Sequence, residues 1–200
     1  MIYIDLDGTL LDVFDRYYGI FIEYARNIGV SISKEEYIQF RHHGLSENEM
    51  LRRCYGKEIN VLSWKQYKRE RLEKREWLLK DFVIGNPQII RECTVPCTLI
   101  TQRRNKTEAF YQIDRLKLTE LFEQVVVLEP LQQGNSKLEY LSRRVTKGDA
   151  IIGDSKIELE CARKLGITGY FVKSGLFGID IVENETICDN YEECLRKFIE

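Results

Sequence analysis

Three acidic residues, Asp5, Asp7 and Asp12, surround the end of the apolar run that opens the chain, MIYIDLDGTLLD. The run has the composition of a strand, in which aspartate is normally depleted, so Asp5 and Asp7 oppose the local preference. Carboxylates in such a position can act as nucleophiles, transfer protons or bind a hard cation. Asp7-Gly8 is also an ordinary turn dipeptide, and we expect Asp12 to be a turn or capping residue.

Further polar residues follow later apolar runs. Thr101 ends the run TLIT, and Asp154 follows the run AIIG. Lys137 lies in the first turn of a predicted helix, where a cation opposes the helix dipole at a cost of about 0.3–1 kcal/mol, and a nearby anion would reverse that sign. Lys106 and Lys147 are rivals for a role beside an anion, and we prefer Lys137 because Lys147 enters the Asp154 strand at its far end.

These residues need a scaffold that brings strand ends together. Strand-like runs are expected at residues 2–6, 97–101, 125–128, 150–153 and 169–173. Helix-start signals lie between the later runs, so strands alternate with helices, which is typical of a parallel sheet with helices on both faces. Such sheets bind ligands at the carboxyl ends of their strands. We therefore expect an α/β fold with a three-layer, Rossmann-like parallel sheet core.

Residues 13–81 differ, since they contain no convincing strand and show helical spacing at residues 17–28, 34–40, 47–54 and 64–80. We expect a helical cap domain at 13–81, inserted into a core domain made of residues 1–12 and 82–200.

Composition limits the class of protein. The chain has 200 residues, 44% of them hydrophobic, and a net charge of -2, so it can bury a core and carries no basic field for nucleic acid or an anionic membrane. No run is long enough to span a bilayer. Six cysteines are scattered without a C-x-x-C pair. We expect a cytoplasmic protein with reduced thiols.

Four segments together resemble the motifs of the haloacid dehalogenase-like hydrolase superfamily. They are DLDGT at residues 5–9, Thr101 after its strand, Lys137 in NSKLEYL, and GDSKIE at residues 153–158. The order and spacing match over the whole chain. Residues 13–81 take the place of the helical, C1-type cap of phosphatases similar to the phosphoglycolate phosphatase and beta-phosphoglucomutase-like members of that superfamily.

The resemblance implies phosphoryl transfer, and the residues supply its parts. Asp5 would attack phosphorus to form an aspartyl-phosphate, while Asp7 would protonate the leaving group and then activate water. Mg²⁺ would be held by Asp5, the carbonyl of Asp7, and Asp154, since clustered carboxylates repel one another without a cation. Thr101 and Lys137 would bind the phosphate.

Two of the remaining site residues, Glu158 and Ser155, have two interpretations each. Glu158 could support the metal or only complete a capping box with Ser155, which could itself cap the helix or meet a metal-bound water. Gln102 is expected beside Thr101 in the phosphate site. Arg41 and His42 lie in the segment RHHGLS between two predicted helices, where capped relatives place a substrate-facing loop.

We expect a phosphatase acting on a small phosphorylated metabolite, as a monomer or weak homodimer. A phosphomutase of the beta-phosphoglucomutase type uses the same residues and stays open, as does a non-catalytic binding or regulatory protein. A dehalogenase is disfavoured because Asp7 is the acid expected for phosphoryl transfer. Arg103 and Arg104 could reach substrate, but solvent is the default for both.

Overall fold

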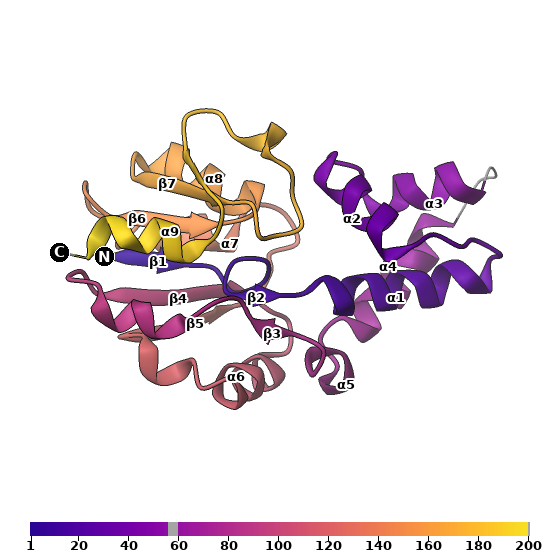
Figure 1. The fold of residues 1–200 in the computed structure, drawn as a ribbon, viewed down its shortest axis with the longest axis horizontal. Coiled ribbons are helices and arrows are strands. Elements are labelled where there is room, and N and C mark those ends of the chain that lie inside the picture. The colour runs from indigo at the N-terminus through magenta and orange to yellow at the C-terminus, as the bar shows by residue number, and fades with distance from the viewer. Residues whose placement is uncertain (56–59, 200) are drawn as a thin grey trace.

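The computed structural model describes residues 1–55 and 60–199. In this part of the chain, parallel strands form a six-stranded sheet in the order β5-β4-β1-β6-β7-β8 (Figure 1). The strands are β1 (Ile2–Ile4), β4 (Cys97–Gln102), β5 (Gln124–Leu128), β6 (Ala150–Gly153), β7 (Thr168–Val172) and β8 (Thr186–Cys188). The five predicted strands are confirmed. The strand β8 was not predicted, since it is a three-residue edge strand in a polar tail.

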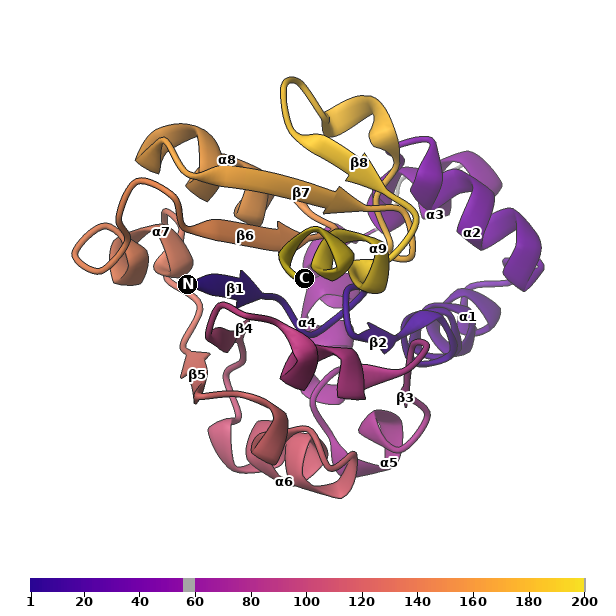
Figure 2. The same cartoon turned by 60° about the vertical axis from the view of Figure 1, so that its left-hand side comes forward.

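Helices cover both faces of the sheet, which confirms the three-layer α/β fold (Figure 2). Successive side chains of β1 point to opposite faces of the sheet. Ile2 and Ile4 share an apolar cluster with residues of two helices, and Tyr3 shares a cluster with residues of two others. The first pair is α6 (Lys106–Arg115) and α9 (Tyr191–Leu195), and the second is α7 (Ser136–Leu141) and α8 (Lys156–Leu165).

A group of helices follows β1 and lies beyond the carboxyl ends of the strands (Figure 1). It consists of α1 (Phe14–Asn27), α2 (Lys34–His42), α3 (Glu47–Tyr55), α4 (Val61–Arg71) and α5 (Arg75–Leu78). We call α1 to α5 the helical insertion. It has its own apolar cluster, which includes Phe21, Tyr37 and Trp64. The domain boundaries expected from the sequence, 13–81, stay a prediction.

A short antiparallel ladder joins the two ends of the helical insertion. It pairs β2 (Leu11–Asp12) with β3 (Phe82–Val83), strands of two residues that the sequence pattern did not reveal. Asp12 accepts a hydrogen bond from the backbone N–H of Phe14, two residues on, at 2.9 Å, which is the turn role expected for it, whereas the N-cap of α1 is Val13.

Two helix predictions were wrong in detail. The helix expected at 64–80 is two helices, because the chain leaves the helical conformation at Lys74 (ψ 142°) between α4 and α5. Arg41 and His42 were expected in a loop, but both belong to the last turn of α2.

Among the described residues, no helix is long and apolar enough to cross a membrane.

Candidate active site

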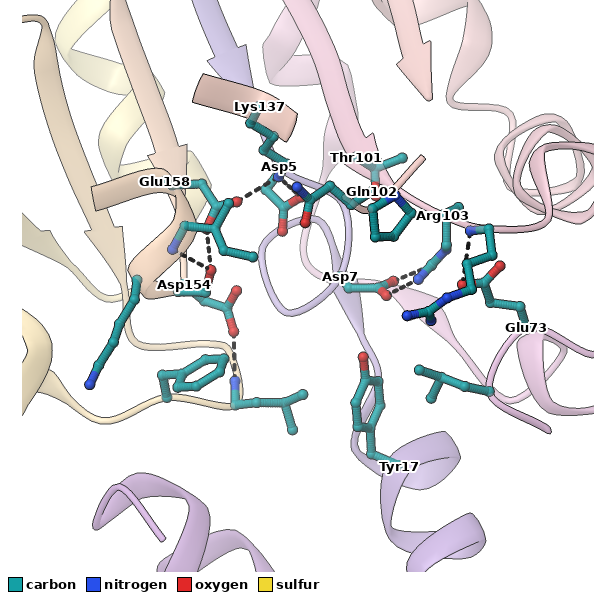
Figure 3. Close-up of a pocket in the computed structure, with 18 of the residues that line it drawn as sticks. Asp5, Asp7, Tyr17, Glu73, Thr101, Gln102, Arg103, Lys137, Asp154 and Glu158 are labelled. Carbon is teal, nitrogen blue, oxygen red and sulfur yellow. Dashed lines mark hydrogen bonds and ion pairs between the residues drawn. The ribbon is translucent and has the colours of Figure 1, made fainter. Parts of the chain in front are cut away.

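The central strand β1 directs the first two acidic residues to the carboxyl edge of the sheet. Asp5 follows β1 directly, and its backbone N–H donates to the carbonyl of Ile152 in β6 at 3.0 Å. Since β4 and β6 flank β1 in parallel register, Thr101 in β4 and Asp154 after β6 reach the same edge. The structure therefore brings together Asp5, Asp7, Thr101 and Asp154, which all line one cavity of about 390 Å³ (Figure 3).

Lys137 enters this cluster from α7. Its ammonium group contacts Asp5 and lies 2.5 Å from Oε1 of Glu158, and the side chain is buried. Burial alone would lower the pKa of Lys137, but the carboxylates of Asp5 and Glu158 overcome that effect and raise it. The rivals Lys106 and Lys147 are both exposed.

Three buried carboxylates, those of Asp5, Asp154 and Glu158, lie within 4.8 Å of one another. Burial raises the pKa of Asp5, and Lys137 offsets part of this effect while Glu158 adds to it. Burial and the neighbouring Asp5 raise the pKa of Asp154 well above its ordinary value. The three carboxylates repel one another, and a bound divalent cation would relieve that repulsion.

Close packing fixes Asp154 in the cluster. The backbone N–H of Leu176 donates to Oδ2 of Asp154 at 2.8 Å. A Cβ atom at Gly8 or at Gly175 would collide with this carboxylate, and Gly8 also has a φ of 77°, which favours glycine. Both glycines allow the backbone to approach the carboxylate, so the expected tight turn after Asp7 also serves Asp154.

Glu158 does not complete the capping box. Ser155 caps α8 by accepting the backbone N–H of Ile157 at 3.1 Å. The carboxylate of Glu158 instead accepts from the Ser155 hydroxyl at 2.5 Å and from Lys137. Glu158 therefore belongs to the buried charge cluster, whereas the capping interpretation holds for Ser155 alone.

Gln102 follows Thr101 at the end of β4 and lines the same cavity. Its side-chain amide donates to the hydroxyl of Ser136 at 2.6 Å, at the start of α7. Thr101 itself is buried and lines the cavity. Gln102 thus connects the end of β4 to the helix that carries Lys137.

Asp7 lies on the other side of the site, beside two guanidinium groups. Arg103 contacts both of its carboxylate oxygens, and Arg16 Nη2 lies 2.8 Å from Oδ1 (Figure 3 shows Arg103). Burial alone would raise the pKa of Asp7, but these cations hold it well below the ordinary value. The expectation that Arg103 is in solvent was wrong, because its side chain is buried against Asp7; Arg104 is exposed.

The carboxylate cluster has two more negative than positive charges when all of its groups are ionised. The three carboxylates of Asp5, Asp154 and Glu158 lie together, and Lys137 pairs with two of them. One divalent cation would balance this charge, and oxygen ligands are those that Mg²⁺ prefers. The donor set therefore fits the expected metal.

The helical insertion closes the cavity opposite the sheet. Tyr17, Arg41 and Lys68 line it, and the Arg41 guanidinium lies 5.1 Å from the ring centroid of Phe177. His42, predicted with Arg41 to bind substrate, lies outside the cavity lining, and its Nε2 donates to the carbonyl of Gly175 at 3.1 Å.

Three residues around Arg103 and Asp7 were not predicted as site residues: Arg16, Asp81 and Gln112. Arg16 is fully buried, and its Nε lies 3.1 Å from Oδ2 of Asp81. A signal was present, since Arg16 is four residues before Ile20 and so shares the helix face that packs inward. A charged residue on such a face needs a buried partner.

Comparison with known proteins agrees with this geometry. Residues 2–172 match the family described as haloacid dehalogenase-like hydrolase. No curated protein matches the chain by sequence. A haloacid dehalogenase-like family hydrolase from Streptococcus pneumoniae has a similar fold, with a TM-score of 0.73, 17% identity, and 98% and 97% of the two chains covered.

Two other solved structures carry more specific descriptions. One is a predicted phosphoglycolate phosphatase from Haemophilus somnus, with a TM-score of 0.70, 14% identity, and 98% of this chain and 96% of that chain covered. The other is a candidate beta-phosphoglucomutase from Thermotoga maritima, with a TM-score of 0.63, 19% identity, and again 98% and 96% covered. At these identities the likeness shows the fold, and the family match spans most of the sequence. The chain belongs to the haloacid dehalogenase-like hydrolases.

Proposed function

We propose that the chain is a Mg²⁺-dependent phosphatase that hydrolyses a small phosphomonoester through an aspartyl-phosphate on Asp5. The observation that carries the proposal is the surroundings of the Asp5 carboxylate. It lies at the cavity, in contact with Lys137 and in one cluster with Asp154 and Glu158. A carboxylate beside a cation, two further carboxylates and an open cavity suits attack on a phosphoryl group better than a purely structural role.

In the first step an oxygen of Asp5 attacks the phosphorus atom. A bond forms between Asp5 and phosphorus and the bond to the ester oxygen breaks. The leaving alkoxide takes up a proton from Asp7, which must be protonated for this step although the two guanidinium groups favour its carboxylate form. In the second step Asp7 accepts a proton from water, whose oxygen attacks phosphorus and releases phosphate and the Asp5 carboxylate. Lys137 and Thr101 hold the phosphoryl oxygens and their charge.

Asp5, Asp154 and the carbonyl of Asp7 would hold Mg²⁺, with Glu158 and Ser155 supporting them. When bound, the cation would neutralise phosphate oxygens and the clustered carboxylates. The proposal is supported by the three-carboxylate cluster and by its excess of negative charge.

The helical insertion would act as a cap that excludes water during the first step. Its residues Tyr17, Arg41 and Lys68 line the cavity opposite Asp5, so they would contact the part of the substrate that leaves. A cavity of about 390 Å³ suits a small metabolite, such as a sugar phosphate or phosphoglycolate, rather than a macromolecule.

The proposal is tested by phosphate release from sugar phosphates, phosphoglycolate, nucleoside monophosphates and p-nitrophenyl phosphate, with Mg²⁺ and with EDTA. We expect Mg²⁺-dependent release, and its loss in Asp5→Asn. An Asp5→Asn variant that keeps the wild-type rate would refute the mechanism. Because one structural neighbour is described as a candidate beta-phosphoglucomutase, hexose phosphate products are also analysed, and an isomer without free phosphate would indicate a mutase.

A further inference from the structure

Asp7 is held in a closed ring of buried side chains. Arg103 contacts both oxygens of its carboxylate, and Arg16 Nη2 lies 2.8 Å from Oδ1. On the far side, Arg16 Nε lies 3.1 Å from Oδ2 of Asp81. Gln112 closes the ring, since its amide nitrogen donates to Asp81 at 2.6 Å and its amide oxygen accepts from Arg103 at 3.3 Å.

The ring spans both parts of the fold. Arg16 lies in the first turn of α1, and Asp81 lies between α5 and β3, so these two come from the ends of the helical insertion. Arg103 follows β4, and Gln112 belongs to α6, both on the sheet side. The carboxylate of Asp7 is therefore fixed by groups from both parts at once.

The ring is expected to contribute little to the net stability of the folded protein. Two guanidinium groups and two carboxylates balance in charge, but removing four ions from water costs about as much as their pairing returns. Arg16, Asp81 and Gln112 are buried away from the cavity, whereas Asp7 and Arg103 line it. The ring is thus anchored inside the protein and presents one carboxylate to the place where substrate would lie.

We infer that Arg103 and Arg16 are positioning residues for Asp7. They hold its carboxylate at one place and in one orientation, at which it accepts the proton of the water that attacks the phosphoryl group on Asp5. The inference rests on the proposed function. It assigns the two arginines to the second step, in which the bond from phosphorus to Asp5 breaks and the bond to the water oxygen forms.

With p-nitrophenyl phosphate as substrate, the inference predicts that formation of the phosphoryl-enzyme and its hydrolysis respond differently to the loss of Arg103. Nitrophenolate leaves without a proton, so formation of the phosphoryl-enzyme does not need Asp7, whereas its hydrolysis does. In Arg103→Gln we expect kcat to fall about 100-fold, kcat/KM to stay within about threefold, and a burst of nitrophenolate equal to the enzyme concentration. Arg103→Lys, which keeps the charge but loses the planar fork, should recover part of kcat.

Two further variants make the test specific. Asp7→Asn should show the same burst, and Arg103→Gln added to Asp7→Asn should lower kcat no further, because the arginine acts through Asp7. Arg163→Gln is the matched control. Arg163 also donates to one carboxylate through two nitrogens, which lie 2.6 Å and 3.1 Å from the oxygens of Glu185. Because Arg163 lies outside the cavity lining, its replacement should produce no burst of nitrophenolate.

A parallel fall of kcat and kcat/KM in Arg103→Gln, without a burst, would overturn the inference and make Arg103 a substrate-binding or structural residue. An additional loss on top of Asp7→Asn would overturn it as well. Wild-type protein that releases no phosphate from any of the phosphomonoesters named above, with Mg²⁺ present, is a different result, which overturns the proposed function itself and the inference with it. Thermal unfolding of each variant confirms that the folded protein is the one assayed.

Discussion

The ammonium nitrogen of Lys137 lies 2.5 Å from Oε1 of Glu158, although the two residues belong to the first turns of different helices, α7 and α8. A cation in a first turn is unfavourable by itself. Here Glu158 and Asp5 surround it with negative charge, so the sign reverses. The contact also joins α7 to α8 on one face of the sheet and keeps the ammonium group beside Asp5.

Replacing Lys137 by methionine should therefore affect both activity and stability. Asp5 and Glu158 would stay buried without their cation, a loss of about 3–5 kcal/mol in the free energy of unfolding of the metal-free protein. Phosphate release should fall by about 10²–10³. Lys106→Met, at an exposed position, is the control and should stay within about twofold of wild type. Normal turnover by Lys137→Met would remove Lys137 from the site.

Asp154→Asn should uncouple metal binding from stability. Burial and the neighbouring Asp5 raise the pKa of Asp154, so the neutral amide should leave the melting temperature of the metal-free protein equal or higher. Mg²⁺ at about 100 times its dissociation constant should stabilise the wild type by about 2.7 kcal/mol, and Asp154→Asn by almost nothing. Thermal unfolding in EDTA and in Mg²⁺ measures both effects.

The control for this experiment is Asp149→Asn. Asp149 lies at the opposite end of the sheet, where it pairs with the N-terminal amine at 2.7 Å, so its loss should lower the melting temperature but keep the Mg²⁺ effect. An unchanged Mg²⁺ shift in Asp154→Asn would show that the ion binds elsewhere.

The strand-end residues of the site could be predicted from sequence because the parallel topology dictates them. Once β1, β4 and β6 are recognised, Asp5, Thr101 and Asp154 must meet at one edge. Glu158 was ambiguous since a capping box and a charge cluster require the same residue three positions after Ser155. Only the position of Lys137, on another helix, decides between them.

The surroundings of Asp7 could not be predicted in this way. Its partners lie 9 residues away, in Arg16, and 96 residues away, in Arg103, on elements whose relative positions no local pattern specifies. Short elements were missed for a related reason. The two-residue strands β2 and β3 and the edge strand β8 have too few residues for an alternating pattern.

A pH-dependent contribution to stability is expected from Glu185. Its hydrogen bonds from Arg163 lower the pKa of the carboxyl from 4.5 to about 2, against the opposing effect of burial. A lowered pKa in the folded state stabilises the protein above pH 4.5, and this contribution disappears as the pH falls from about 4.5 to about 2. The difference in unfolding free energy between wild type and Glu185→Gln should therefore shrink across that interval, as measured by urea unfolding. A difference that is constant with pH would contradict the assignment.

Arg41 should determine how tightly the substrate binds. Its Nη1 donates to the carbonyl of Leu45 at 3.2 Å and its guanidinium lies over Phe177, so it is held at the part of the cavity wall that the helical insertion forms. A contact made equally in the ground and transition states affects KM rather than kcat. Arg41→Ala should raise KM for the best substrate about tenfold, the value of one charged hydrogen bond, and leave kcat within about twofold. His43→Ala, at an exposed position two residues on, is the matched control and should change neither constant. An Arg41→Ala variant with unchanged KM would mean that the substrate does not reach α2, and the residues contacting it would then be sought on α1 and α4, at Tyr17 and Lys68.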